Sequence, residues 1–365
     1  MKLKSKPTVL ASFSILSLIY LSIVYYFAVN IPNADDFGMY FATILSYFNG
    51  DDLLAILIRK HGEHFILTTR LAAIISAKVL GSIDFSFFIL IGAIAPILSV
   101  IILSKFTKHN PGLILLLCSL LLLNSSYHQV LTWAAASIEH LWVMPFILLA
   151  LLLDRSPSKY KLLWQVFFSG LAYLTQGNGV FCFAALAIAA FLKRSYKNSI
   201  FWLVLLVGGL LIHFRTVEFS ATTKQLNFLD SIRYIFSFIG SPFAYSFDAS
   251  IAIGLFLTLL AAVLFLQSRS THKPELIGLL VFVLLTAAAN AFARGSLGVN
   301  YAYTQSRYIY PALFFSIALI ILIVDNPQIN WRTGFSKFLL SLCFIFSIFS
   351  YWKNIPFLEL RKQTL

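Results

Sequence analysis

The sequence predicts an all-α, polytopic integral membrane protein. Of its 365 residues, 59% are hydrophobic and only 11% are charged, and the mean hydropathy is +0.86. A soluble chain of this length typically needs about 25% charged residues to cover its surface. The apolar residues also form blocks suited to crossing hydrocarbon, which takes about 20 residues per helix. The alternating pattern of a membrane β-barrel is absent.

Eleven apolar runs are predicted to be transmembrane helices. The first run follows the Lys-rich start of the chain and has no small-residue cleavage site after it, so we interpret it as a retained anchor. No internal repeat or linker divides the chain, and residues 1–365 are therefore predicted to form a single membrane domain. The runs lie near residues 8–29, 85–104, 112–124, 138–153, 162–176, 180–192, 200–214, 250–267, 276–292, 308–324 and 337–352.

The distribution of charge predicts the orientation. If the N-terminus is cytoplasmic, the cytoplasmic turns and the N-terminus hold 15 of the 27 Lys and Arg residues but only three of the 14 acids, Asp154, Glu275 and Asp325. This asymmetry follows the positive-inside rule. The same rule accounts for the net charge of +13, so nucleic acid is not an expected partner. Cys118, Cys182 and Cys343 each lie in an apolar run and show no disulfide or metal spacing.

Two long segments are predicted on the extracytoplasmic side, residues 30–84 and 215–249. The first is expected to carry interfacial helices near 37–48 and 65–80. The run at 65–81 is apolar enough to resemble a span, but Arg70 and Lys78 interrupt it. We interpret it as a helix in the outer interface whose basic side chains snorkel to the surface.

Polar residues gather on this predicted outer side. Asp35 and Asp36 follow the first apolar run, and His61, Glu63 and His64 lie in RKHGEHF (59–65). If the helix ends converge, these residues and the later polar loops should line one outward-facing cavity. The later loops are NSSYHQVLTW (124–133), SIEHLW (137–142), TQGNG (175–179) and ARGSLGVNYAYTQSRY (293–308).

Each group also has a purely structural interpretation. The two aspartates would simply end a helix in water, and the glycines of TQGNG would form a tight turn. The histidines with Glu63 would form an interfacial cluster, a proton relay or metal ligands, although the His-Glu-x-x-His motif is absent. Arg294 and Arg307 would anchor helix ends. The recurrence of ionisable groups at several helix ends favours function, because such groups at membrane level usually carry it.

The order of these elements resembles the GT-C superfamily of membrane glycosyltransferases. The matching pieces are a first span, the acidic doublet in ADDF (34–37), HGEHF (61–65) before an interfacial helix, and RG (294–295) with SRY (306–308) near a late span. Protein O-mannosyltransferases, lipid A aminoarabinose transferases and bacterial enzymes of surface-polysaccharide synthesis belong to this superfamily. The resemblance covers the N-terminal two-thirds of the chain best.

The resemblance implies an inverting enzyme that moves a sugar from a polyprenyl-phosphate carrier to an acceptor hydroxyl on a glycan, lipid or protein. Asp35 or Asp36 would be the catalytic base, with Asp35 favoured, and His61, Glu63 and His64 would orient the acceptor or the base. Arg294, Arg307 and Tyr308 would bind the donor phosphate. Oligosaccharyl transferases of this superfamily use a divalent cation, but no residue pattern here demands one. The implied location is a bacterial inner membrane, with the active site extracytoplasmic.

Three other functions fit the same composition. A flippase or transporter of lipid-linked glycans usually shows internal repeats or matching broken helices in two halves, which this chain lacks. A polysaccharide polymerase would rely on outer-loop arginines more than on an early aspartate doublet. An accessory protein would have no chemistry of its own.

Overall fold

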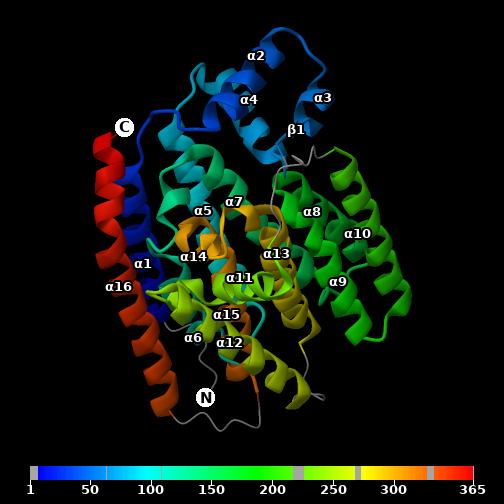
Figure 1. The fold of residues 1–365 in the computed structure, drawn as a ribbon, viewed down its shortest axis with the longest axis vertical. Helices are drawn as coiled ribbons and strands as arrows, with labels where there is room; N and C mark the ends of the chain where they lie inside the picture. Colours follow the sequence, from blue (N-terminus) through cyan, green and yellow to red (C-terminus); the bar gives the residue numbers. More distant parts are fainter. Residues whose placement is uncertain are drawn as a thin grey trace.

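The computed structural model is a bundle of α-helices with a smaller helical cap at one end (Figure 1). It describes residues 7–62, 64–107, 109–216, 226–267, 273–326 and 333–364. Within these ranges, eight helices are long and apolar enough to cross a membrane. They are α1 (Pro7–Phe27), α5 (Phe85–Ser104), α7 (Ala134–Leu153), α10 (Tyr196–Thr216), α12 (Phe247–Gln267), α13 (Pro274–Arg294), α15 (Ile309–Val324) and α16 (Thr333–Thr364).

The other three predicted spans are also helices, but shorter ones. They are α6 (Pro111–Leu122), α8 (Lys161–Thr175) and α9 (Phe181–Leu192), with 12, 15 and 12 residues. A straight helix needs about 20 residues to cross the hydrocarbon layer. The all-α, polytopic membrane class is therefore confirmed, whereas the count of eleven spans stays a prediction.

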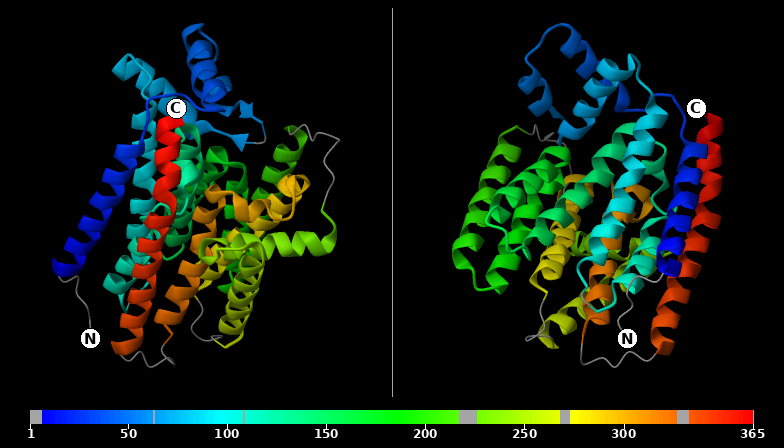
Figure 2. Two further views of the ribbon diagram at one scale, coloured as in Figure 1. Left: turned by 60° about the vertical axis from the view of Figure 1, so that its left-hand side comes forward. Right: turned by 180° about the vertical axis from the view of Figure 1, so that it is seen from behind.

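The remaining elements form the cap and the connections between helices. The cap lies beyond one end of the bundle, and α11 lies across the bundle rather than along it (Figure 2). The predicted loop 215–249 thus contains a helix of its own. The cap contains η1 (Phe37–Phe41), α2 (Ala42–Phe48), α3 (Leu53–Ile58), the hairpin β1 (Lys60–His61) and β2 (His64–Phe65), and α4 (Leu67–Leu80); the connections contain η2 (His128–Leu131), η3 (Gly177–Val180), α11 (Phe228–Gly240), η4 (Ser241–Phe243), η5 (Gly295–Leu297), α14 (Tyr301–Thr304) and η6 (Ser306–Tyr308).

Helix α7 lies at the centre of the bundle. It packs closely on α5, because Gly92 has no side chain: a Cβ atom there would lie 1.8 Å from the Ser137 hydroxyl. Small residues allow this close approach of helices in membranes. The spans α7 and α15 are mostly buried, whereas α1, α10, α12 and α16 expose most of their apolar side chains. These exposed helices form the surface suited to lipid.

Helix α4 differs from its prediction in one respect. Lys78 is exposed, as expected for a snorkelling side chain, but Arg70 is 2% exposed. The Arg70 guanidinium donates hydrogen bonds to the carbonyl oxygens of Leu57 and Arg59 at the end of α3. The last carbonyls of a helix lack partners within the helix and favour a cation. The expectation that Arg70 reaches the surface is therefore wrong, since it joins two helices of the cap.

An ion-pair network joins the turns at the end of the bundle opposite the cap. Lys193 Nζ lies 2.6 Å from both Asp154 Oδ2 and Glu275 Oε1, and Arg155 Nη2 lies 3.2 Å from Glu275 Oε2. All three acids of the predicted cytoplasmic turns are thus neutralised by neighbouring bases. The other pairs are Lys161 with Asp154 and Lys273 with Asp325.

Replacing the buried acid that pairs with two bases should destabilise the protein. We expect Glu275→Gln to lower the free energy of unfolding by about 2 kcal/mol, because it leaves Arg155 without its carboxylate partner and Lys193 with Asp154 alone. This loss of stability is smaller than the loss expected for a fully buried ion pair, because both cations still reach water. The control is Glu359→Gln at an exposed position. Equal thermal unfolding midpoints of the two variants in detergent would contradict the role of the network.

Candidate functional site

A cavity of about 650 Å³ lies where the cap meets the ends of α7, α9, α10 and α13. Six of the eight predicted site residues line it: Asp35, His61, His64, Arg294, Arg307 and Tyr308. They come from four separate segments of the chain. The structure therefore brings most of the predicted residues together around one space. Glu63 lies outside the described residues.

Asp36 is separated from this group. Its side chain is fully buried, and its carboxylate accepts hydrogen bonds from Ala135 N (2.8 Å) and Asn33 N (2.9 Å). Ala135 lies in the first turn of α7, whose own N-cap residue, Trp133, makes no side-chain cap bond. Because helix N-termini favour negative charge and need acceptors for their free N–H groups, Asp36 caps α7 from a distant segment.

The carboxylate of Asp36 is both buried and hydrogen-bonded. Burial raises the pKa of Asp36 to about 6, although the two backbone N–H donors act in the opposite direction. Both of its carboxylate oxygens already accept hydrogen bonds from backbone N–H groups. Asp36 is thus held against α7, whereas the neighbouring Asp35 is exposed to the cavity. Which of the two acts as a base stays a prediction.

The backbone before the doublet has an unusual conformation. Ala34 has a φ of 47°, in the left-handed region, which costs roughly 1–2 kcal/mol for a residue with a Cβ atom. The turn is closed by the hydrogen bond from Asp36 N to Asn33 O at 3.0 Å. Such strain persists only where the surrounding structure holds it. Here the Asp36 anchor holds the strained turn and directs Asp35 towards the cavity.

The short hairpin of the cap presents two histidines. His61 and His64 face each other as a direct pair across β1 and β2, so their side chains lie on the same face. Gly38 allows η1 to approach, since a Cβ atom there would lie 2.9 Å from His61 Cε1. Burial lowers the pKa of His61, while Asp35 acts to raise it. His61 and Asp35 are therefore electrostatic neighbours.

His64 is held in one tautomer between two partners. Its Nδ1 accepts a hydrogen bond from Gly177 N at 3.3 Å, and its Nε2 lies 3.9 Å from Glu139 Oε1. Burial, together with Arg294 and His213, lowers the pKa of His64 well below its usual value. The ring is consequently neutral at pH 7, with its proton on Nε2 facing Glu139. A Cβ atom on Gly177 would lie 2.6 Å from Nδ1, so only glycine fits there.

Arginines and tyrosines form the opposite wall. Arg307 Nη2 donates to the Tyr301 hydroxyl at 2.7 Å, and the guanidinium carbon lies 5.3 Å from the centre of the Tyr308 ring. Tyr234 of α11 is buried and is not among the residues that line the cavity; burial and Tyr308 raise its pKa, while Arg294 and Arg307 act to lower it. Among the described residues, the buried Arg307 Nε has no hydrogen-bond partner. This wall offers donors and positive charge to an anion.

Several polar residues of the cavity were not predicted individually. Glu139 and His140 come from SIEHLW, and Gln176 and Asn178 from TQGNG, two loops that the sequence placed near the cavity. Gln176 Nε2 donates to His140 Nδ1 at 2.7 Å. His213 and Asn290 lie inside runs interpreted as spans, and their polarity within apolar surroundings was the available signal.

No group of three or more His, Cys, Asp or Glu side chains in the described ranges is arranged to hold a metal ion. Comparisons with protein-family models, with curated proteins and with solved structures give no match for this chain. Function is therefore argued from the cavity itself.

The anchoring role of Asp36 leads to a matched pair of variants. We expect Asp36→Ala to lower the free energy of unfolding by about 1–2 kcal/mol, because it leaves the Ala135 N–H buried without an acceptor. Asp35→Ala makes the same change at the neighbouring position, where no such bond exists, and should unfold near the wild-type midpoint. Thermal unfolding in detergent measures both. The reverse order of stabilities would contradict the assignment.

Proposed function

We propose that the protein is an inverting membrane glycosyltransferase that moves a sugar from a polyprenyl-phosphate carrier to an acceptor hydroxyl. The observation that carries the proposal is the shared cavity: an accessible carboxylate, Asp35, faces the same space as Arg294 and Arg307. Glycosyl transfer from a phosphate donor needs both a base and a site for the phosphate.

The arginine and tyrosine wall suits the donor phosphate. Arg294 and Arg307 supply charge-assisted hydrogen bonds to phosphate oxygens, which a planar guanidinium binds in bidentate fashion. The hydroxyl of Tyr308 adds a donor at the same wall. The adjoining part of the cavity is apolar, with Leu210 from α10 and Leu285 from α13, and suits the first isoprene units of the carrier.

The carboxylate of Asp35 suits the general base. As the acceptor oxygen attacks the anomeric carbon, a carbon–oxygen bond forms and the bond from that carbon to the phosphate oxygen breaks. The proton of the acceptor hydroxyl passes to Asp35, and the carrier phosphate leaves with its negative charge. A single displacement inverts the anomeric configuration. A leaving phosphate needs no strong general acid, unlike hydrolysis with two carboxylates.

Neutral imidazoles suit the acceptor side. His64 keeps a donor on Nε2 beside Glu139, and His61 lies near Asp35. These groups would orient the acceptor hydroxyl without competing with Arg294 and Arg307 for the phosphate. The residues described give no role to a divalent cation, and the proposed step uses none.

The orientation proposed is an extracytoplasmic cavity in a bacterial inner membrane. The basic turns meet at the Asp154 end of α7, whereas the cavity lies at its Ala134 end. Twenty helical residues separate these ends by about 30 Å, the thickness of the hydrocarbon layer. The positive-inside rule then assigns the basic end to the cytoplasm.

Removal of the base should abolish most transfer. We expect Asp35→Asn to reduce turnover by about 100-fold or more with radiolabelled polyprenyl-phosphate sugars, the range typical of a lost general base. Asp51→Asn, at another exposed position of the same loop, is the control and should remain near wild type. Unchanged turnover in a folded Asp35→Asn protein would reject the assignment.

Sidedness can be tested with single cysteines, because the native Cys118, Cys182 and Cys343 are all buried. We expect a membrane-impermeant thiol reagent to label Asp51→Cys on intact cells and Ser158→Cys only after permeabilisation. Both positions are exposed, at opposite ends of the bundle. The opposite labelling would move the cavity to the cytoplasmic side.

A further inference from the structure

We propose that an apolar groove beside the cavity binds a single hydrocarbon chain of a lipid-linked acceptor. The inference rests on the proposed glycosyl transfer and adds the class of acceptor, which that proposal leaves open. The groove is distinct from the apolar part of the cavity assigned to the carrier.

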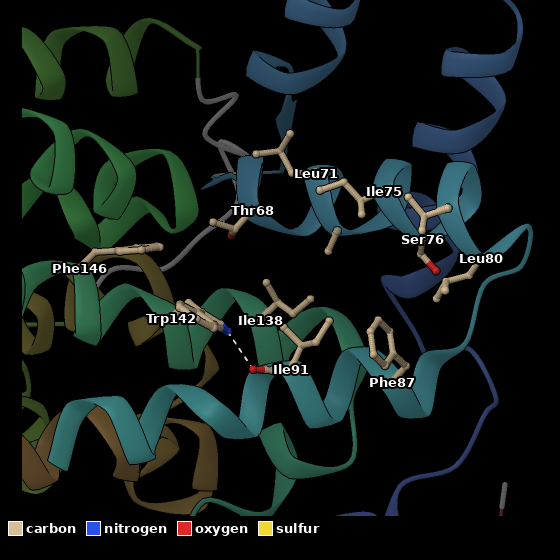
Figure 3. Close-up of a pocket in the computed structure, with 12 residues that line it drawn as sticks. Thr68, Leu71, Ile75, Ser76, Leu80, Phe87, Ile91, Ile138, Trp142 and Phe146 are labelled. Atoms are coloured by element: carbon tan, nitrogen blue, oxygen red, sulfur yellow. Dashed lines mark hydrogen bonds between the residues drawn. The ribbon is translucent and has the colours of Figure 1, made fainter. Parts of the chain in front are cut away.

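The groove has a volume of about 430 Å³ and lies between α4 and the pair α5 and α7 (Figure 3). Leu71 and Ile75 of α4 line one side of the groove. The other side is formed by Phe87 and Ile91 from α5 and by Ile138 and Trp142 from α7. No charged side chain lines the groove.

Most polar atoms of the groove already have hydrogen-bond partners within the protein. The Trp142 indole N–H donates to Ile91 O at 3.1 Å, and the Ser76 hydroxyl donates to Ser82 O at 2.9 Å. Among the described residues, the buried Thr68 hydroxyl alone of the groove's side chains lacks a partner. An occupant is therefore a hydrocarbon chain with at most one polar group, near Thr68.

The size of the groove matches one chain. A methylene group takes up about as much space as a liquid water molecule, about 30 Å³. By this measure the groove has room for an alkyl chain of roughly a dozen methylene groups. Burying such a chain is favourable, because it removes apolar surface from water.

The groove is placed to deliver a head group to the cavity. Thr68 follows His64 by four residues, and Ile138 precedes Glu139; in each pair one residue lines the groove and the other lines the cavity. Arg294 and Arg307 line the cavity but not the groove. A chain in the groove therefore brings its head to the side of His64 and Glu139, where we place the acceptor hydroxyl.

Quenching of Trp142 fluorescence tests occupancy without relying on activity. The probe is dodecyl glucoside brominated near the end of its chain, added to the full-length protein in phosphatidylglycerol nanodiscs. Because the chain has six tryptophans and Trp164 and Trp352 are exposed, Trp142→Phe gives the background. We expect the wild type to show a saturable component of quenching that Trp142→Phe lacks. Methyl glucoside, which has no chain, should not compete with the probe.

Two variants of α4 form the matched comparison. Ala72→Phe places a ring in the groove, whereas Ala77 does not line it, so Ala77→Phe should bind like the wild type. We expect the Ala72→Phe protein to bind about tenfold more weakly, as if roughly two methylene groups were displaced. If that protein does not fold, Ile75→Asp places a charge in the groove at a position already 58% exposed and should weaken binding similarly.

The outcomes separate the two proposals. Quenching that does not saturate, or that is unchanged in Ala72→Phe and Ile75→Asp, overturns the groove assignment whatever the enzyme does. Saturable quenching that needs the groove, in a protein without transfer from any polyprenyl-phosphate sugar, supports the chain site and rejects the proposed function. Transfer to dodecyl glucoside but not to methyl glucoside, lost selectively in Ala72→Phe, supports both.

Discussion

The carboxylate of Asp36 holds the N-terminus of α7, and the geometry of the cavity depends on that contact. Helix α7 is the central span, and its first turn would otherwise present free N–H groups to a buried environment. Asp36 accepts a hydrogen bond from the backbone N–H of Ala135, which lies 99 residues later in the chain. This bond fixes the segment after α1 onto α7. The cap, the histidine hairpin and the cavity wall are thereby held in one arrangement.

Charge is distributed differently at the two ends of the bundle. At the Asp154 end, acids and bases neutralise one another in direct pairs, which stabilises the turns and leaves little unpaired charge. At the cavity end, Arg294 and Arg307 line the same space as Asp35, Glu139 and the histidines, and Arg307 donates to the Tyr301 hydroxyl. Guanidiniums that line a cavity can bind an anionic ligand through charge-assisted hydrogen bonds.

Sequence patterns predicted the elements better than their contacts. Apolar runs located every long helix, since the cost of unsatisfied backbone in hydrocarbon leaves few alternatives. The burial of Arg70 was missed because its partners, the carbonyls at the end of α3, come from a helix too short to be recognised. Six of the predicted site residues line one cavity, because charged and polar residues at the ends of apolar runs indicate which loops can meet there. His213 and Asn290 were missed because their apolar neighbours dominate the hydropathy of a span.

In the proposed mechanism, the acidic doublet divides anchoring and proton acceptance between two carboxylates. A carboxylate that accepts two backbone hydrogen bonds has its oxygens committed and its position fixed, whereas a base needs an oxygen within reach of the substrate proton. Adjacent residues in the same turn point in different directions, so Asp36 faces α7 while Asp35 faces the cavity. The left-handed Ala34 links the two tasks, because its strained turn persists only while Asp36 is held. Loss of the anchor would therefore displace Asp35 even though its own carboxylate remained intact.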